Sequence, residues 1–203
     1  MRVLAGALKG RRLQTPRGST TRPTADQVRL ALMDTLTSRL AGARLLDLFA
    51  GAGGVGFEAL SRGAAHVTFV ERDARALAAL RANVDVLGVE AQTRVERGAV
   101  QPVLDRLAAE GARYDLVFLD PPYEAGALTP TLERLGVLDV VVGDGLVIAQ
   151  HLTKRPPPAR TGRLTAFRTR RFGETTLTFF RADGYDSPFR NAPASDDGPS
   201  ARS

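Results

Sequence analysis

The stretch LLDLFAGAGGVG, residues 45–56, decides the fold expected for this chain. A short apolar run over 44–48 leads into the glycines Gly51, Gly53 and Gly56 and then into residues with helical spacing. Glycines at such a turn let the backbone bend sharply and let a bulky ligand approach it closely. This order of strand, glycine turn and helix predicts the first unit of a nucleoside-binding α/β domain.

Downstream of this stretch, strand and helix patterns alternate. Strands are predicted over 44–48, 66–71, 93–97, 114–119 and 146–150, and helices over 55–61, 73–87, 100–110 and 127–135. Repeated units of this kind predict a parallel sheet covered by helices on both faces. The alternating segments 164–170 and 175–181, rich in Thr and Phe, predict an antiparallel hairpin. The expected architecture is therefore a doubly wound, Rossmann-like sheet of seven strands, mostly parallel, with an antiparallel C-terminal hairpin.

The two ends of the chain differ in composition from this α/β region. Residues 1–24 carry glycines, prolines and short apolar runs, which predict a basic N-terminal arm with a small β-hairpin. Thr24 has the character of an N-cap for a helix over 25–40, and we expect the main domain to span 25–183. The segment 184–203 is rich in Asp, Pro, Ser and Gly, so we expect it to be a disordered tail.

The composition limits the chemistry available. The 203 residues include no cysteine and only two histidines, His66 and His151, which excludes disulfides, thiolate zinc sites and cysteine nucleophiles. The sequence contains no apolar run of the roughly 20 residues needed to span a bilayer, and the N-terminus lacks the apolar core of a signal peptide. We therefore expect a soluble, cytoplasmic monomer without a membrane partner.

Basic residues are concentrated in two stretches. The net charge is +6 and the calculated pI is 10.6, and residues 154–171 hold seven Lys or Arg and no acid. Such asymmetry is typical of proteins that bind polyanions. In the N-terminal stretch, the residues expected to bind nucleic acid are Arg2, Lys9, Arg11, Arg12, Arg22 and Arg29.

Acidic residues around the glycine turn indicate which nucleoside binds there. Glu71 closes the second predicted strand, twenty residues after Gly51, where a carboxylate can accept the ribose hydroxyls of NAD or of S-adenosylmethionine equally well. Asp47 lies just before the turn and would attract the ammonium and sulfonium of S-adenosylmethionine but repel the pyrophosphate of NAD. The residues expected to bind the cofactor are Asp47, Phe49, Gly51, Gly53, Glu71, Arg72, Gly98 and Ala99.

The segment Asp120-Pro121-Pro122-Tyr123 follows the fourth predicted strand directly, where catalytic loops lie in open α/β sheets. Two prolines fix the backbone, and Asp120 and the Pro121 carbonyl can accept the hydrogens of an exocyclic base amine while Tyr123 stacks on the base. Accepting both hydrogens localises the nitrogen lone pair, which is otherwise delocalised into the ring. A sulfonium methyl donor is already activated, so the prediction is catalysis by positioning and electrostatics, without a metal.

Taken together, these motifs resemble the class I methyltransferases with a D/N-P-P-Y/F loop, and more narrowly the RsmD-type bacterial 16S ribosomal RNA guanine-N2 methyltransferase family. The resemblance is carried by segments 2–6, 10–13, 22–24, 47–53, 58–64, 120–123 and 172–175, together with Glu71. It implies S-adenosylmethionine as donor, N2 of a guanine in 16S rRNA as acceptor, and a partly assembled small subunit as the preferred substrate. It also implies that Arg22, Pro23 and Thr24 lie near the cofactor or the target base, and it adds Thr24 to the residues expected to bind the cofactor.

Three other functions fit parts of the sequence. The same catalytic loop serves N6-adenine methyltransferases acting on DNA or RNA. An NAD-dependent oxidoreductase fits the glycine spacing, but no catalytic Tyr-Lys pair or histidine is evident. A non-catalytic RNA-binding assembly factor fits the charge and does not need Asp120.

Overall fold

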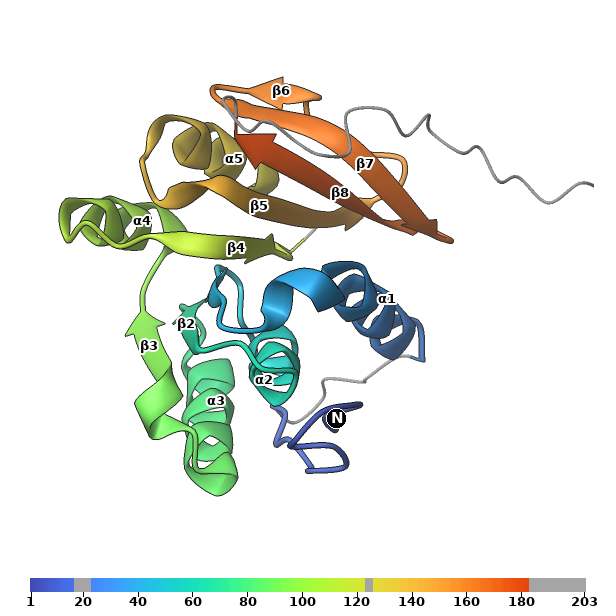
Figure 1. The fold of residues 1–203 in the computed structure, drawn as a ribbon, viewed down its shortest axis with the longest axis vertical. Coiled ribbons are helices and arrows are strands. Elements are labelled where there is room, and N and C mark those ends of the chain that lie inside the picture. Colours follow the sequence, from blue (N-terminus) through green and yellow to red (C-terminus); the bar gives the residue numbers. More distant parts are fainter. Residues whose placement is uncertain (17–22, 123–125, 183–203) are drawn as a thin grey trace, which may run out of the picture.

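The computed structural model describes residues 1–16, 23–122 and 126–182. Its strands are β1 (Arg44–Asp47), β2 (His66–Glu71), β3 (Thr93–Arg97), β4 (Tyr114–Leu119), β5 (Val141–Leu152), β6 (Arg160–Thr161), β7 (Leu164–Phe172) and β8 (Thr175–Ala182). They form one eight-stranded sheet in the order β3-β2-β1-β4-β5-β8-β7-β6 (Figure 1). The pairs from β3 to β5 are parallel, and β8, β7 and β6 continue the sheet with antiparallel pairing. The predicted fold class is confirmed.

Helices cover both faces of this sheet. They are α1 (Pro23–Leu40), α2 (Gly54–Ser61), α3 (Ala74–Leu87), α4 (Val100–Ala109) and α5 (Leu128–Val137), with a short 3-10 helix, η1 (Glu90–Gln92). One apolar core lies between the sheet and α1, α2 and α3, and a second lies between the sheet and α4 and α5. Strand β4 contributes Leu116 and Phe118 to the first core and Val117 and Leu119 to the second. This explains its uninterrupted apolar sequence, because both of its faces are buried.

The carboxyl ends of β1, β4 and β5 meet at one edge of the sheet. Asp47 of β1 pairs with Phe118 of β4, and Leu119 of β4 pairs with Ala149 of β5. The strand order reverses between β1 and β4, and ligands of open α/β sheets bind outside the carboxyl ends at such a reversal. The glycine turn after β1 and the Asp120-Pro121 segment after β4 both lie at this edge.

The N-terminal arm folds back on itself and packs on α2. Arg2 and Arg12 form an antiparallel bridge, and Val3 and Leu13 are buried in the core beneath α1, α2 and α3. The fully buried carboxylate of Glu58 accepts hydrogen bonds from the backbone N–H groups of Leu4 and Ala5, at 2.8 and 3.0 Å. The arm is thus held largely through its main chain.

The structure changes several predicted boundaries. Strand β6 is an eighth strand, and its two residues are too few to show a periodicity. Strand β5 begins well before 146, because Gly143-Asp144-Gly145 has the composition of a turn but lies inside the strand. Helix α1 begins at Pro23, so Thr24 lies within the helix and not at its N-cap; a proline suits a first helical turn because its missing N–H would have no partner there. The predicted tail, 184–203, lies outside the described residues. In the described ranges, no helix combines the length and apolar character required to cross a membrane.

Candidate active site

The glycine turn after β1 is formed by two residues with left-handed backbone conformations. Gly51 has φ of 55° and Gly53 has φ of 88°, a region that L-residues with side chains rarely adopt. A Cβ added to Gly53 would lie 2.3 Å from Cε2 of Phe57, whereas one added to Gly51 would meet nothing within 4 Å. Gly53 is therefore required by packing inside the protein. Gly51 borders open space, which a ligand can occupy.

Glu71, at the end of β2, holds the glycine turn in place. Its Oε2 accepts a hydrogen bond of 2.7 Å from the backbone N–H of Gly51, and its Oε1 accepts bonds of 2.7 Å from those of Arg72 and Asp73. The backbone N–H of Gly98, after β3, donates to the Glu71 carbonyl oxygen at 3.1 Å. Glu71 thus connects the turns that follow β1, β2 and β3. Three of the acceptor positions on its carboxylate are used by backbone groups, which leaves one for a ligand.

Asp47 is a buried carboxylate with one oxygen that lacks a hydrogen-bond partner among the described residues. Its side chain is 2 % exposed, and its Oδ1 has no hydrogen-bond partner among the described residues. Burial, and then repulsion by Asp120, raises the pKa of Asp47 to about 7, although the backbone N–H groups of Phe49 and Gly56 oppose the shift. An unpaired buried charge is strongly unfavourable, so this oxygen is suited to meet a cationic ligand.

Asp120 follows β4 and lies beside Asp47 at the carboxyl edge. Burial raises the pKa of Asp120 to about 7. Asp120 lies two residues beyond Phe118, the residue that pairs with Asp47, so both carboxylates belong to the same edge of the sheet. Pro121 is buried and Pro122 is exposed. Tyr123, predicted to stack on the base, lies outside the described residues.

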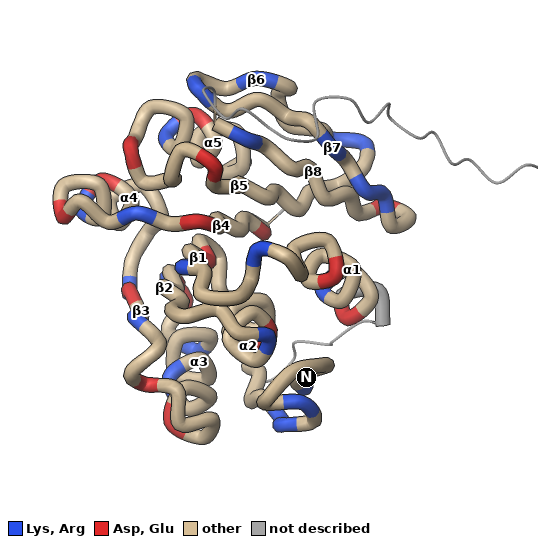
Figure 2. The backbone as a smooth tube through the Cα atoms, in the orientation of Figure 1, with Lys and Arg blue, Asp and Glu red and all other residues tan. Residues whose placement is uncertain are grey.

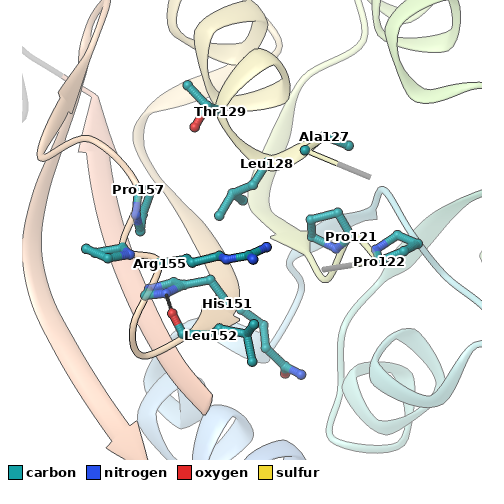
Figure 3. A pocket seen from close by; sticks show the side chains of 12 residues that line it. Pro121, Pro122, Ala127, Leu128, Thr129, His151, Leu152, Arg155 and Pro157 are labelled. Carbon is teal, nitrogen blue, oxygen red and sulfur yellow. Dashed lines mark hydrogen bonds between the residues drawn. The ribbon is translucent and has the colours of Figure 1, made fainter. Parts of the chain in front are cut away.

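A cavity of about 260 Å³ lies on the β5 side of this loop. Its wall is formed by Pro121, Pro122, Gly126, Ala127, Leu128, Thr129, Gln150, His151, Leu152, Arg155, Pro156 and Pro157 (Figure 3). Since β1 and β5 flank β4 on opposite sides, the glycine turn and this cavity approach Asp120-Pro121 from opposite sides. The arrangement can hold two ligands that meet at this loop. The volume is below the roughly 300–1,000 Å³ of pockets for drug-sized molecules and is suited to a single planar base.

Sequence reasoning did not assign His151 and Arg155 to this site, because neither residue is part of a recognisable motif. The His151 ring is buried, with Nε2 2.8 Å from Oγ1 of Thr178 and Nδ1 2.8 Å from the Leu152 carbonyl oxygen. Burial lowers the pKa of His151, so its ring is neutral at physiological pH.

Asn83 of α3 was also missed by sequence reasoning. Its Nδ2 donates to the carbonyl oxygens of Gln14, at 2.9 Å, and of Ala52, at 3.0 Å, while its Oδ1 accepts from the Gln14 N–H at 2.7 Å. The side chain is 1 % exposed. One buried amide thereby joins the end of the arm to the glycine turn. A polar residue on the apolar face of a helix, next to Leu80 and Leu87, was the signal available in the sequence.

The other residues expected to bind the cofactor lie around the same edge. Phe49 and Gly98 are partly exposed, and Arg72 and Ala99 are exposed. Thr24 lies in the first turn of α1. All of them except Thr24 belong to the turns after β1, β2 and β3 that Glu71 connects.

Figure 2 marks the basic residues along the backbone, and the burial of their side chains shows that not all of those predicted to bind nucleic acid reach the surface. Arg2, Lys9 and Arg12 are exposed on the arm. Arg11 is exposed as well, and its guanidinium donates to the carbonyl oxygen of Val86 on α3. Arg22 lies outside the described residues.

Arg29 requires a correction. Its side chain is 6 % exposed, pairs with Asp26 at 3.0 Å and lies 3.8 Å from Glu58. It also donates to the carbonyl oxygen of Arg2 at 2.9 Å. Arg29 is therefore committed to holding α1, α2 and the arm together, and is not placed to bind RNA.

The second basic stretch, residues 154–171, also contains both arginines that bind other parts of the protein and basic residues that are exposed. Arg163 donates to the carbonyl oxygens of Leu138 and Val141, and Arg170 donates to Ala31 and Thr35 of α1. Lys154, Arg155, Arg160, Arg168 and Arg171 are exposed.

The donor set fits S-adenosylmethionine. The unpartnered Oδ1 of Asp47, the open space at Gly51 and the carboxylates of Glu71 and Asp120 together favour a nucleoside with positive charge. They disfavour a pyrophosphate, because three carboxylates would repel it.

Comparison with solved structures supports the same class. SMU.776, provisionally named a methyltransferase and solved in complex with S-adenosylhomocysteine, matches with a TM-score of 0.64 over 80% of this chain and 50% of that one. At 16% identity this likeness is one of fold. YhhF from Escherichia coli, provisionally named a methyltransferase, matches with a TM-score of 0.77 and 30% identity over 90% of this chain and 97% of that one. The fold and the site define an S-adenosylmethionine-dependent methyltransferase of class I.

The particular family follows from sequence comparison. Residues 1–181 match the family model described as conserved hypothetical protein 95. YlbH of Bacillus subtilis, provisionally named an rRNA methyltransferase, is 34% identical over 184 residues, 91% of this chain and all of that one. Ribosomal RNA small subunit methyltransferase D of Escherichia coli is 36% identical over 135 residues, 66% of each chain. The chain belongs to the conserved hypothetical protein 95 family, and the predicted RsmD-type resemblance is confirmed.

Proposed function

We propose that this protein transfers a methyl group from S-adenosylmethionine to N2 of one guanine in 16S ribosomal RNA, within an assembling small ribosomal subunit in the cytoplasm. The names of the relatives in Bacillus subtilis and Escherichia coli support ribosomal RNA as the substrate. The RsmD-type loop Asp120-Pro121-Pro122-Tyr123 supports an exocyclic base amine as the acceptor.

The observation that carries this proposal is the pair of carboxylates at the ends of adjacent strands. Asp47 is buried and Asp120 is half-buried at the ends of these strands, and the pKa of each is raised to about 7, so a cationic ligand beside them would stabilise their ionised forms. Asp47 would hold the methionine ammonium, and Glu71 would accept from the ribose hydroxyls. Asp120 would face the base from the opposite side of the donated methyl group.

S-adenosylmethionine, when bound, supplies an electrophilic methyl group on a sulfonium. Beside such a positive charge the pKa of Asp120 would fall below the value near 7 of the cofactor-free protein, so its carboxylate would be ionised when the base arrives. Asp120 and the Pro121 carbonyl would accept the two hydrogens of N2 and so direct its lone pair toward the methyl group, which N2 would take as the thioether leaves. Asp120 would then accept the extra proton from N2 and release it to water.

RNA would reach this site across the arm. Arg2, Lys9 and Arg12 form an exposed basic surface on residues 1–16, and phosphates are the partners that such surfaces favour. This surface lies next to α2, whose first turn follows the glycine turn (Figures 1 and 2).

The test combines a variant with nucleoside analysis. Asp120→Asn keeps the shape of the side chain and removes the charge, so methyl transfer to small subunits from a deletion strain should fall at least about 100-fold. Binding of S-adenosylhomocysteine, measured by calorimetry, should persist. Asp85→Asn, an exposed change on α3, is the control and should leave both unchanged.

Mass spectrometry of 16S rRNA nucleosides from the deletion strain identifies the acceptor. Loss of N2-methylguanosine supports the proposal. Loss of N6-methyladenosine instead would assign the adenine reaction, and full activity of Asp120→Asn would reject catalysis by this carboxylate.

A further inference from the structure

Strand β7 carries an exposed aromatic ring on the side of the sheet that faces α1. The side chain of Phe167 is 45 % exposed, and among the residues that the structure describes it is the one exposed aromatic side chain. Its ring centroid lies 6.5 Å from that of Phe179 on β8, with the two rings inclined at 60°. Phe179 belongs to the core beneath α1, so Phe167 lies on the same side of the sheet, and part of its ring is open to solvent.

A β-bulge in β7 places an arginine beside this ring. The pairing register shifts between Ala166 and Arg168, so Phe167 has no partner of its own on β8, and Arg168 pairs with Phe179. Such a bulge sets two residues opposite one and changes the direction in which a side chain points. Phe167 and the exposed Arg168 therefore both lie opposite Phe179.

The charges around the ring all have one sign. Strands β7 and β8 contain the arginines Arg168, Arg170, Arg171 and Arg181 and neither Asp nor Glu, and Figure 2 shows basic positions along β7. The Arg181 guanidinium lies over the Phe167 ring, 5.8 Å from its centroid. Within the described parts of the chain, Arg168 and Arg181 form no ion pair. Phe167, Arg168 and Arg181 together form what we call the β7 surface, which attracts a polyanion.

The outer edge of β7 distinguishes between two kinds of partner. Strand β6 pairs with β7 only at Leu164 and Thr165, so within the described residues no strand pairs with the edge over 167–172. An open edge can accept a strand from another protein, but bulges and basic side chains are features that hinder such pairing. An aromatic ring beside arginines is instead the combination that binds single-stranded nucleic acid, because bases stack on the ring and the cations hold phosphates.

Strands β7 and β8 connect this surface to the edge of the sheet where the candidate site lies. Arg171, near the end of β7, pairs with Thr176, which pairs with His151 of the cavity wall. Phe167 lies four residues before Arg171, a distance of roughly 13 Å along a strand. In the view of Figure 1 the N-terminal arm lies below α1 and β7 lies above it. A strand of RNA that enters the site can therefore contact both surfaces at different nucleotides.

We propose that the β7 surface binds a single-stranded segment of the RNA substrate, with one base stacked on Phe167 and the flanking phosphates held by Arg168 and Arg181. This rests on the proposed function, because it takes RNA as the substrate. Every base has a flat face, so the contact tolerates different sequences. It adds affinity and orients the strand, whereas the site at Asp120 acts on the target base.

The experiment separates stacking from charge. Fluorescein-labelled decauridine and an RNA duplex of the same length are titrated with the full chain at several salt concentrations, and binding is followed by anisotropy. Phe167→Leu keeps an apolar contact with Phe179 but removes the flat face, whereas Phe167→Trp keeps that face. Arg168→Gln removes one exposed charge from the surface, and Arg81→Gln, at an exposed position of α3, is its matched control. Calorimetric titration of each variant with S-adenosylhomocysteine checks that the fold is intact.

Phe167→Leu should bind decauridine roughly 5- to 150-fold more weakly than the wild type, the range expected for one stacked base. Phe167→Trp should bind it as the wild type does. Duplex binding should be the same in all three proteins, because the bases of a duplex already stack on one another. Arg168→Gln should lower the affinity for decauridine and reduce the slope of log K against log salt by about 0.7. Arg81→Gln should leave the affinity and the slope near their wild-type values.

Equal affinities of Phe167→Leu and Phe167→Trp for decauridine, or no binding of decauridine by the wild type, would overturn the proposal. If Phe167→Leu bound decauridine normally but lost affinity for small ribosomal subunits, the surface would contact a protein, and the proposal would also be rejected. An rRNA nucleoside profile that is unchanged in the deletion strain would instead reject the proposed function. The decauridine affinities test the β7 surface independently of that result.

Discussion

Replacing Asp47 with Asn isolates the effect of the buried charge, because Asn keeps the shape of the side chain. Burial, followed by repulsion from Asp120, raises the pKa of Asp47 from 3.8 to about 7. The unfolded chain ionises this group near its ordinary pKa, so between the two values the native state binds more protons and loses stability as the pH rises. At about 1.4 kcal/mol per pKa unit, the ionised group lowers the free energy of unfolding of the cofactor-free protein by about 4 kcal/mol above pH 7.

Asn cannot recover the whole of this energy. Its NH2 group would occupy the position of an oxygen without a partner, and an unsatisfied buried donor costs about 1–3 kcal/mol. Asp47→Asn should therefore raise the free energy of unfolding by roughly 1–3 kcal/mol at pH 8, and this gain should shrink by roughly 2–3 kcal/mol at pH 5. The same variant should bind S-adenosylmethionine at least about tenfold more weakly, because a hydrogen bond to a charged group is lost.

Urea unfolding at pH 5 and pH 8 measures the first effect, and calorimetric titration measures the second. Asp85→Asn, in which an exposed carboxylate is lost, should show no comparable change with pH. A stability difference between variant and wild type that is the same at both pH values, or a variant that is less stable at pH 8, would refute the reasoning.

Two further predictions concern the turns around the cofactor. Glu71→Ala should weaken S-adenosylhomocysteine binding roughly 10- to 100-fold, because it removes an acceptor and also releases the Gly51 N–H; Asp73→Ala, which removes only the N-cap of α3, should lower stability by about 1 kcal/mol and spare affinity. Equal affinities in calorimetric titrations of the two variants would contradict this. Gly53→Ala should lower the free energy of unfolding by roughly 2–4 kcal/mol, since the new Cβ lies 2.3 Å from Phe57 in a left-handed backbone. Gly51→Ala should lower it by only about 1–2 kcal/mol, yet weaken cofactor binding by filling the open space. Urea unfolding and titration of the pair measure both, and a reversed order of stabilities would show that the two glycines have been assigned the wrong roles.

The layered fold could be predicted because each signal it needed was local. The apolar strands, the glycine turn and the helix periodicities are each contained within about ten residues, so β1 to β4 and the helices between them agree with the predictions to within a few residues. The eighth strand, β6, could not be predicted, because two residues are too few to show an alternation of apolar and polar side chains. The start of β5 could not be predicted either, because a Gly-Asp-Gly sequence is typical of turns. Pairing with β7 holds β6, and Val141 pairs with Tyr114 of β4 ahead of a bulge, after which the pairing of β5 with β4 resumes at Leu146.

The position of a candidate-site residue could be predicted where a sequence motif follows the end of a predicted strand. Asp47, Glu71 and Asp120 lie at the carboxyl edge, as strand order requires. Arg29 was assigned to RNA because charge alone does not reveal burial, and its partner Glu58 lies 29 positions away in the sequence. Asn83 could not be found from the sequence for the same reason, since its importance comes from contacts with distant segments.

The way in which the arm is attached has a consequence for its divergence. Leu4, Ala5 and Leu8 donate backbone N–H groups to side-chain oxygens of Glu58 and Ser61, so almost any residue at those positions supplies the same three donors. The outward-facing side chains are therefore not needed to attach the arm to α2. A library randomised at Arg2, Lys9 and Arg12 would therefore vary what the surface recognises while the backbone of the arm keeps its shape. Evolution or protein engineering could change the binding specificity of this hairpin and leave the active site unchanged.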